Sequence, residues 1–383
     1  NTKPIYLITA QLEGYRRIKL TINKWCKPFR RAKVVEIDFG ILQEYHDEKI
    51  RSIDIIEEIS IANENIPSSE STIVLDNQDR AFNVLNRDGF NRFLQERQQI
   101  KIDMGVEVLI DSDIYEFVPM GVFYLRDWQI DEGSMSTTLT SRDIIDVIAT
   151  EDYEGNISTN LYDLAEDIFI INNVEKYNID ANLKNIPTNG FDKKIKVRQA
   201  LQHIAVASKA AIYQDRYGVL QVKRFELLDA HTTYMMYVGI DMYCGMVTPT
   251  VDKGIDMREL TLDQMYAEPQ IKLDKLLKSV TIKVNEIEYS FTNPGVREGE
   301  NVEIDNPLIL TEEHAEEIAE WIIYESNLRA IYDIRWRQNP VLERGDIIKV
   351  EDSFGSNKQS RILRNEFSYA GYLSGNIVAK GGV

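Results

Sequence analysis

The sequence predicts an α+β fold dominated by strands, and changes in the spacing of apolar residues predict it. Through most of residues 31–139 apolar and polar residues alternate, as they do in half-buried strands. Between 143 and 208 apolar residues recur every three or four positions, which is the spacing of amphipathic helices. After 232 the strand spacing returns, interrupted by one helix that begins near Thr311.

The first predicted part, residues 1–150, is rich in strands. Turn residues at 65–71, 86–89, 111–113 and 131–134 separate them, as in a barrel or a sandwich. A short helix is expected at 143–148, where the spacing changes. The expected strands lie around Val35–Phe39, Ile53–Ile59, Ile73–Leu75, Ile100–Ile102 and Val122–Ile130.

The second part, residues 151–228, is predicted to be an α/β insert. Leu161, Leu164 and Ile168 mark one helix, for which Ser158 is the expected N-cap. A second helix over Val197–Ser208 leads into a strand at 211–214. The turn Asp215–Gly218 then starts a hairpin.

Residues 229–310 return to strands, expected at 235–238, 271–273 and 280–284 and described below as the third part. The fourth part, 311–383, opens with a helix that Thr311 caps, followed by closing strands between 332 and 379. We expect the apolar stripe of this helix to pack on the closing strands. The stripe consists of Ala315, Ile318, Ala319 and Ile322.

Charge and composition exclude several classes of protein. The chain has 44 Lys+Arg against 62 Asp+Glu, a net charge of −18, which disfavours tight binding to nucleic-acid phosphates. It contains no apolar run long enough for a membrane span, so we expect none. Cys26 and Cys244 lack the spacing of a zinc ribbon or a disulfide framework, and fit a protein made in a reducing cytoplasm.

A search for catalytic chemistry finds no motif, so neither catalytic nor metal-binding residues nor a cofactor are predicted. The sequence has no G-x-S-x-G elbow, no phosphate-binding P-loop and no Gly-x-Gly-x-x-Gly unit between a strand and a helix. Its acidic pairs lack the spacing of a calcium loop. None of the four histidines has the HExxH spacing; these are His46, His203, His231 and His314.

Aromatic residues at strand positions leave two interpretations open. They can form core and subunit contacts, or they can form a surface on which sugars stack. Core and subunit contacts are favoured, because no cluster of aromatics falls on a single loop. The residues concerned are Tyr115, Phe117, Phe123, Tyr124, Trp128 and Trp336.

Three stretches resemble the phage tail-tip and baseplate hub family. The first is Ser71–Asn77, a strand ending in Leu-Asp-Asn, followed by a Phe-x-x-Leu-Asn loop. The second is 196–222, which is similar to the α/β insert of that family, and the third is 336–375. The residues that carry the first and third patterns are Leu75, Asp76, Asn77, Phe82, Leu85, Asn86, Trp336, Pro340, Gly345, Asp346, Tyr369, Leu373 and Gly375.

The resemblance implies a non-enzymatic structural role. The family includes the trimeric hub of contractile tails and the N-terminal region of siphophage tail-associated lysins. It implies two β-barrel-like hub domains, here 1–150 and 229–310, with the α/β insert between them and the helix and strands of 311–383 after them. The expected assembly is a homotrimer that joins the hexameric tail tube to the tip and rings the DNA channel.

The implied partners and location follow from the same family. The partners are the distal tail or tail tube ring, the tip, spike or fibre proteins and the tape-measure protein. The location is the virion tail tip or baseplate, after synthesis in the bacterial host cytoplasm. Two alternatives stay open: a receptor- or glycan-binding baseplate module, and part of a tail-associated cell-wall hydrolase. No hydrolase region is recognised in this sequence, so we expect any lytic activity on another chain or segment.

Overall fold

The computed structural model describes residues 43–61, 65–107, 115–155, 159–226, 228, 259–284 and 286–382. The chain divides into two units, Asn1–Tyr45 and His46–Val383, and every helix and strand given below belongs to the second. Several expectations lie outside the described residues: the strands at 35–39 and 235–238, Ser158, His231 and both cysteines. None of the described helices is long and apolar enough to cross a membrane.

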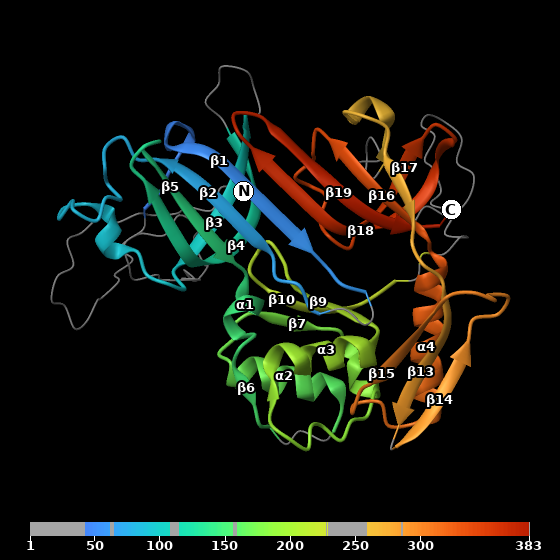
Figure 1. Cartoon of the computed structure of the whole chain (residues 1–383). Coiled ribbons are helices and arrows are strands. Elements are labelled where there is room, and N and C mark those ends of the chain that lie inside the picture. The colour runs from blue at the N-terminus through green and yellow to red at the C-terminus, as the bar shows by residue number, and fades with distance from the viewer. Residues whose placement is uncertain are drawn as a thin grey trace, which may run out of the picture. The chain divides into compact units, whose positions relative to one another are not determined.

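An 11-stranded sheet dominates the described part and confirms the strand-dominated α+β fold (Figure 1). Its main path runs β12-β16-β19-β18-β1-β2-β5-β4-β3, while β17 pairs with β18 and β11 with β17. The strands are β1 Ile50–Glu58, β2 Glu70–Asp76, β3 Gln99–Glu107, β4 Tyr115–Asp131, β5 Ser136–Arg142, β11 Glu259–Leu260, β12 Gln270–Leu273, β16 Ala330–Trp336, β17 Ile347–Asp352, β18 Gly355–Tyr369 and β19 Leu373–Gly381.

The described strands do not form the closed barrels that the family resemblance suggested. Instead β1 pairs antiparallel with β18, so that Ile53 lies opposite Tyr369, and this pairing joins early and late strands in one open sheet. The alternation of apolar residues predicted the strands correctly. In β2, for example, Ser71, Ile73 and Leu75 are buried while their neighbours are half-buried. Alternation shows which face of a strand is buried and not which distant strand it pairs with.

The three helices predicted before residue 229 are present, one at the end of the first part and two in the α/β insert. They are α1 Ile144–Ile148, α2 Leu161–Ile171 and α3 Val197–Ser208. Asn160, rather than the expected Ser158, caps α2, because its side chain accepts a hydrogen bond from the amide of Asp163. The strands of the insert are β6 Asp152–Tyr153, β7 Tyr177–Ile179, β8 Ile195–Lys196, β9 Ala210–Gln214 and β10 Leu220–Arg224. Short 3-10 helices occur in the insert at η3 Ala181–Asn185 and in other parts of the chain at η1 Asp47–Lys49, η2 Phe90–Phe93 and η4 Leu262–Gln264.

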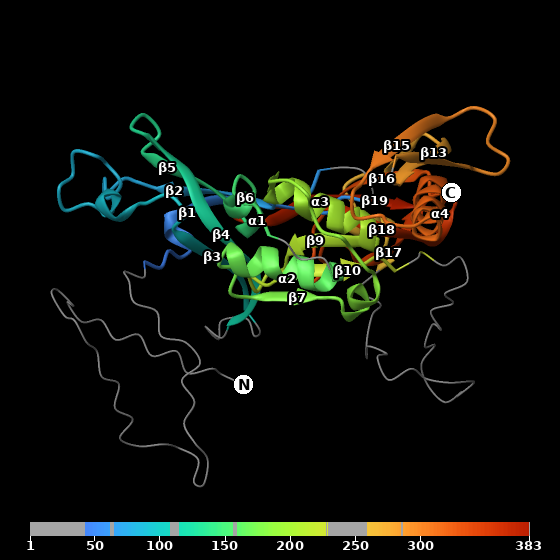
Figure 2. The same cartoon turned by 90° about the horizontal axis from the view of Figure 1, so that it is seen from below.

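The predicted hairpin after Gln214 is confirmed, since β9 and β10 pair antiparallel. β7 adds to β10 in parallel and completes a three-stranded sheet. Figure 2 shows α2 and α3 beside this sheet. The spacing of apolar and turn residues was sufficient to predict this hairpin, because β9 and β10 are close in sequence.

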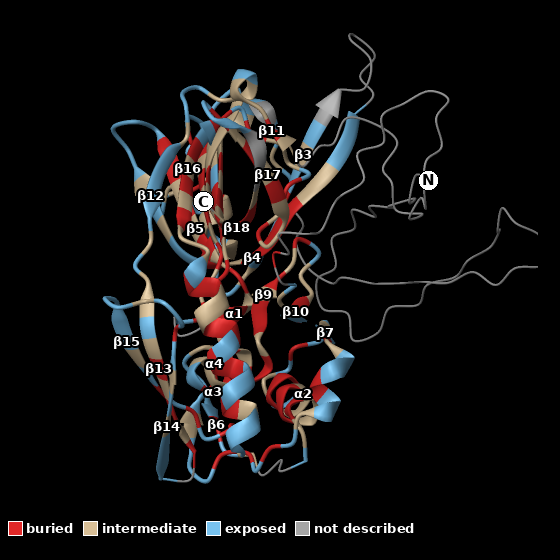
Figure 3. Cartoon of the chain, turned by 90° about the vertical axis from the view of Figure 1, so that its right-hand side faces the viewer, coloured by how far each residue is buried: buried red, intermediate tan, exposed pale blue. Residues whose placement is uncertain are grey.

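The helix that begins after Thr311 is α4, Glu312–Asn327, and the Thr311 hydroxyl accepts a hydrogen bond from the amide of His314. Its predicted stripe is buried, as the colouring in Figure 3 shows along one side of the helix. The expectation that it packs on the closing strands is wrong. It packs on β13 Leu277–Val284, which with β14 Ile287–Thr292 and β15 Glu300–Asp305 forms a separate sheet. Alternate residues of β13 are buried there and supply an apolar face.

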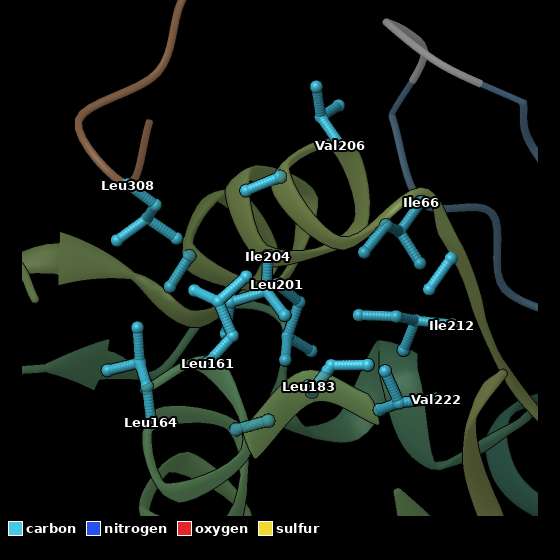
Figure 4. Close-up of a cluster of buried hydrophobic side chains, with 14 of the residues drawn as sticks. Ile66, Leu161, Leu164, Leu183, Leu201, Ile204, Val206, Ile212, Val222 and Leu308 are labelled. Atoms are coloured by element: carbon cyan, nitrogen blue, oxygen red, sulfur yellow. The ribbon is translucent and has the colours of Figure 1, made fainter. Parts of the chain in front are cut away.

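Two apolar clusters fill the described unit. The larger one includes residues of α1, α2, α3, β13, β15 and α4, and Figure 4 shows Leu308 in the same cluster as Leu161 and Leu164. The smaller one lies among the closing strands, around Tyr332 and Trp336. The insert and the α4 region therefore share one core, while the closing strands have their own.

Candidate functional site

The structure places the thirteen family-pattern residues in two groups on either side of β1. Leu75 of β2 lies opposite Ile50 of β1, and Tyr369 of β18 lies opposite Ile53. The first group continues into the 77–89 loop, which we define as Asn77–Gly89. The second surrounds the 337–346 loop, defined as Arg337–Asp346, between β16 and β17. These two loops are the candidate functional elements.

A buried ion pair connects the 337–346 loop to the hairpin and to β1. The Arg216 guanidinium donates to both carboxylate oxygens of Glu57, with Nε–Oε1 at 2.7 Å and Nη2–Oε2 at 3.0 Å. Both side chains are about 3% exposed. Arg216 also donates to the carbonyl oxygens of Pro340 and Leu342. Burial alone would lower the pKa of Arg216, but the carboxylates of Glu57, Glu343 and Asp346 together outweigh burial and raise it.

The loop is also tied to the closing strands through Gln338. This residue is buried and has a left-handed backbone, with φ at 66°. Its side-chain amide donates to Asn365 Oδ1 at 2.7 Å and to the Glu366 carbonyl at 2.6 Å. Asn365 in turn donates to the carbonyl of Leu342 at 2.9 Å. The bonds form one continuous network with Arg216, which also donates to Leu342.

Glycine is required at position 375 of β19, because the Gln338 side chain passes close to the strand there. It lies opposite Trp336 of β16 and Phe367 of β18. A Cβ atom at Gly375 would lie 2.0 Å from the Glu366 carbonyl oxygen and 2.5 Å from Gln338 Cγ. Both contacts are far below van der Waals distance, so any other side chain would force the backbone or the Gln338 side chain to move.

A second arginine of the loop reaches the insert. Arg344 is 6% exposed and donates to the Ser69 hydroxyl and the Gln214 carbonyl. The Gln214 amide donates to the Val122 carbonyl at 2.6 Å, which links the hairpin to β4. Asp143 accepts from the Ser69 amide at 2.8 Å, and burial raises the pKa of this carboxyl against the opposing effect of Arg344.

The remaining pattern residues of the loop shape its backbone. Gly345 has φ at 84°, a left-handed conformation that favours glycine, and its amide donates to the Ile362 carbonyl at 2.8 Å. Asp346 accepts from the Glu343 amide at 3.0 Å. The loop therefore turns sharply while its polar groups stay bonded.

The space enclosed at this junction is small. Its lining includes Glu57, Asp143, Gln214, Arg216 and Arg344, and its volume is about 10 Å³, enough for about one water molecule. Among the described residues no cluster of three His, Cys, Asp or Glu side chains could hold a metal. His314 Nε2 lies 2.8 Å from the Ala207 carbonyl, and the His203 ring lies beside Phe191. The hydrogen bonds of this junction fix β1, the hairpin and the 337–346 loop to one another.

A second buried ion pair, which the sequence did not reveal, fixes α4 to the large sheet. Arg361 of β18 donates to Glu325 of α4 at 2.9 Å, and both side chains are at most 4% exposed. The guanidinium lies over the Phe225 ring, 4.8 Å from its centroid, and Phe225 stacks on Trp321. Arg361 lies within the 336–375 stretch, but Glu325 is 36 residues away and outside it, so no local pattern could have indicated the pair.

The 77–89 loop is ordered by its asparagines. Asn77 is buried, and its side chain accepts from the Phe82 amide at 3.0 Å. Asn83 accepts from the Leu85 amide at 2.8 Å. Asn86 donates to the Arg80 carbonyl at 3.0 Å. These bonds fold the loop on itself without a regular element.

The two apolar pattern side chains of this loop, Phe82 and Leu85, differ in exposure. Phe82 is 2% exposed and packs edge-on against Phe90, with ring centroids 5.8 Å apart. Leu85 is 89% exposed and its neighbour Val84 is 74% exposed. The structure therefore brings Phe82 and Asn77 together and leaves Leu85 at the surface.

Comparisons with known proteins give a match by structure and none by sequence. No family model matches the chain, and no curated protein sequence matches it. The tail protein from Neisseria meningitidis MC58 aligns with a TM-score of 0.55 and 12% identity, covering 86% of this chain and 92% of that protein.

Two further solved structures align less closely. The 43 kDa tail protein of prophage MuSo2 from Shewanella oneidensis has a TM-score of 0.49 and 13% identity, covering 86% of this chain and 93% of its own. The prophage tail protein gp18 from Listeria monocytogenes EGD-e has a TM-score of 0.48 and 11% identity, covering 85% and 94%. The fold of this chain is similar to that of the Neisseria tail protein, and the resemblance to phage tail-tip and baseplate proteins predicted from the motifs is confirmed at the level of the fold.

Proposed function

We propose that the chain is a structural subunit of the tail tip or baseplate of a phage or a phage-tail-like particle. The single observation that carries this proposal is the fold similarity to the Neisseria tail protein, which extends over 86% of this chain and 92% of that one. The motif residues give further support, because the Pro340 carbonyl accepts from Arg216 of the insert and the Gly345 amide donates to Ile362 of β18. A structural subunit needs such hydrogen-bonded connections between its parts more than it needs a ligand-binding pocket.

The finer role we propose is that of a hub. Three copies would form a ring that joins the hexameric tail tube to the trimeric tip, with the distal tail ring, tip or fibre proteins and tape-measure protein as neighbours. DNA would pass through this ring without being bound, since the net charge of −18 disfavours contact with phosphates. The role is structural and not catalytic.

The expected lining of such a channel can be narrowed. Candidates for an acidic channel wall lie in the turns and strand edges of the first part: Asp76, Asp79, Glu107, Asp111 and Asp113. Asp76 pairs with Arg51, and Asp79 pairs with Lys49 at 2.6 Å. Asp111, Asp113 and the side chain of Glu107 lie outside the described part. The two described aspartates are therefore partly neutralised, and a channel wall that includes them would be close to neutral.

Antibody labelling of purified particles tests the location. We expect gold label at the tail end distal to the head, or at one end of a headless particle. Label absent from intact particles, or found along the tail tube, would contradict the proposal. Glycan-array binding and peptidoglycan zymography on the same protein test the receptor-binding and hydrolase alternatives, and we expect both to be negative.

The mass of the purified chain tests the hub role separately. Light scattering should give three copies of the 44.2 kDa chain, about 133 kDa. A chain that stays monomeric in solution and occurs as six or more copies per tail tip would contradict the trimer while leaving the tail location intact.

A further inference from the structure

The chain contains one Asn-Gly pair, Asn189–Gly190, in the segment between η3 and β8. Such a pair can react without an enzyme, because glycine has no side chain to keep its backbone nitrogen away from a neighbouring group. The Gly190 nitrogen attacks the side-chain amide carbon of Asn189 and forms a C–N bond, its proton passes through solvent to the side-chain amide group, and that group leaves as ammonia. Solvent water then opens the resulting cyclic imide to an aspartate or an isoaspartate.

The side chain of Asn189 is open to this reaction, whereas the attacking nitrogen is not free. Asn189 is exposed, and no hydrogen bond within the described residues holds its side-chain amide. Gly190 is buried and has a left-handed backbone, with φ at 72°. The carbon to be attacked is therefore at the surface, and the nitrogen that attacks it belongs to a residue inside the fold.

The Thr188 hydroxyl holds this nitrogen. The Gly190 amide donates to the Thr188 hydroxyl at 3.0 Å, and Thr188 is 2% exposed. The Thr188 amide donates in turn to the Thr159 carbonyl at 3.3 Å, which fixes the residue that carries the hydroxyl. An amide that donates a hydrogen bond in a buried position is harder to deprotonate and to turn than one in water, because breaking the bond leaves a buried group unpaired.

The segment is also held on both sides of the pair. Pro187 lies opposite Asn160 in an antiparallel bridge. After the pair, Phe191 is 9% exposed and packs edge-on against Tyr153, with ring centroids 6.2 Å apart. The backbone of the pair therefore turns freely only when the segment opens locally.

We propose that Asn189 is a deamidation site that the folded chain protects, and that the Thr188 hydroxyl is the group that protects it. Loss of the hydrogen bond between Gly190 and Thr188 releases the nitrogen and allows the imide to form. Either product adds a negative charge to the chain, and isoaspartate also lengthens the backbone just before Gly190. This protection does not depend on what the chain assembles with.

Three variants of the full chain test the role of the hydroxyl. Thr188→Val removes the acceptor and keeps a side chain of similar shape, whereas Thr188→Ser keeps the acceptor. Thr159→Val is the matched control, because it removes an exposed hydroxyl from the adjoining segment and leaves the carbonyl that accepts from Thr188.

The rate of deamidation is measured on folded and on unfolded protein. Each chain is kept at mildly alkaline pH, once folded, as circular dichroism verifies, and once unfolded in guanidinium chloride. Mass spectrometry of the tryptic peptide 185–193 then follows loss of the Asn189 amide. Asn185 in the same peptide is an internal reference, because the branched side chain of Ile186 hinders attack by its nitrogen.

Only the loss of the acceptor should release the reaction in the folded chain. We expect folded Thr188→Val to lose the Asn189 amide about fivefold or more faster than the native chain, the factor that corresponds to one lost hydrogen bond. Folded Thr188→Ser and Thr159→Val should react at the native rate. In guanidinium chloride all four chains should react at one common rate, which exceeds that of the folded native chain.

Three outcomes would overturn the proposal. The folded native chain loses the Asn189 amide as fast as the unfolded chain, the unfolded chain does not lose it, or folded Thr188→Val reacts no faster than Thr159→Val. If Thr188→Val does not fold, hydrogen exchange of the Gly190 amide in the native chain decides. Strong protection of this amide is expected, and exchange at the rate of an exposed amide would overturn the role of Thr188.

Discussion

The 337–346 loop and the 77–89 loop are fixed by the same kind of hydrogen bond but direct their side chains differently. In both, side chains hydrogen-bond to backbone groups and fix an irregular segment. The 337–346 loop directs polar groups inward, where its Pro340 and Leu342 carbonyl groups accept from Arg216 of the hairpin and its Arg344 reaches the insert. The 77–89 loop buries Phe82 and directs Leu85 outward. One loop therefore joins parts of a single chain, and the other leaves an apolar side chain exposed at its tip.

The largest effect should come from breaking the inward loop's ion pair. Glu57→Gln leaves the Arg216 charge buried without its partner and should lower the free energy of unfolding by about 3–5 kcal/mol. Urea denaturation followed by circular dichroism measures it. Glu58→Gln is the matched control, because the neighbouring Glu58 pairs with Arg364 near the surface and should cost less than about 1 kcal/mol. If both substitutions lowered the free energy of unfolding equally, the buried Glu57–Arg216 pair would contribute no more to stability than the exposed Glu58–Arg364 pair.

A smaller loss is expected at the crossing of Gln338 over β19. Gly375→Ala puts a Cβ atom 2.0 Å from the Glu366 carbonyl, so the strands must shift, at about 1–3 kcal/mol. Gly382→Ala, where nothing lies within 4 Å, should stay within about 0.5 kcal/mol of the native chain. If thermal unfolding shows Gly375→Ala to be as stable as Gly382→Ala, the close crossing is absent in solution.

The outward loop should be less sensitive to loss of a single bond. Asn77→Ala removes the acceptor for the buried Phe82 amide and should cost about 1 kcal/mol. The neighbouring Gln78 is exposed, and Gln78→Ala should have no measurable effect on the urea midpoint. An Asn77→Ala protein with unchanged stability would mean that the loop does not depend on its asparagines.

The smallest effect on stability should come from the loop tip. Leu85→Ser should change the unfolding free energy by no more than about 0.5 kcal/mol when the chain is diluted to monomers, because the side chain is 89% exposed. Phe82→Ala, three residues earlier, should cost about 3–5 kcal/mol. A comparable loss from Leu85→Ser would show that this side chain packs within its own chain and is not available to a partner.

Local features of the fold could be predicted from the sequence, and long-range ones could not. The Thr311 cap and the buried stripe of α4 follow from spacing alone, and so does the hairpin after Gln214. The surface that α4 packs on was predicted wrongly, because an apolar stripe says what is buried and not what covers it. The α2 cap was displaced by two residues, since Ser158 and Asn160 are both good caps and only geometry selects one.

For the candidate site, too, local features could be predicted from the sequence and long-range contacts could not. The motifs located the 337–346 loop and the 77–89 loop, yet the residues that give the first loop its role lie elsewhere. Glu57 and Arg216 are 159 residues apart, and no motif connects them. The need for glycine at 375 depends on the position of Gln338, which the sequence does not reveal.

The pairing of β1 with β18 has a consequence for how the protein is made. The Ser368 hydroxyl donates to Asp54 across this pair at 2.6 Å, and the two residues are 314 positions apart. During synthesis one edge of β1 stays without its native neighbour until β18, about 300 residues later, has left the ribosome. An edge left open so long can pair with the wrong strand, and sheets closed by such distant contacts fold slowly. We therefore expect completion of the large sheet to be the late step of folding, when the newly made chain is most prone to aggregate.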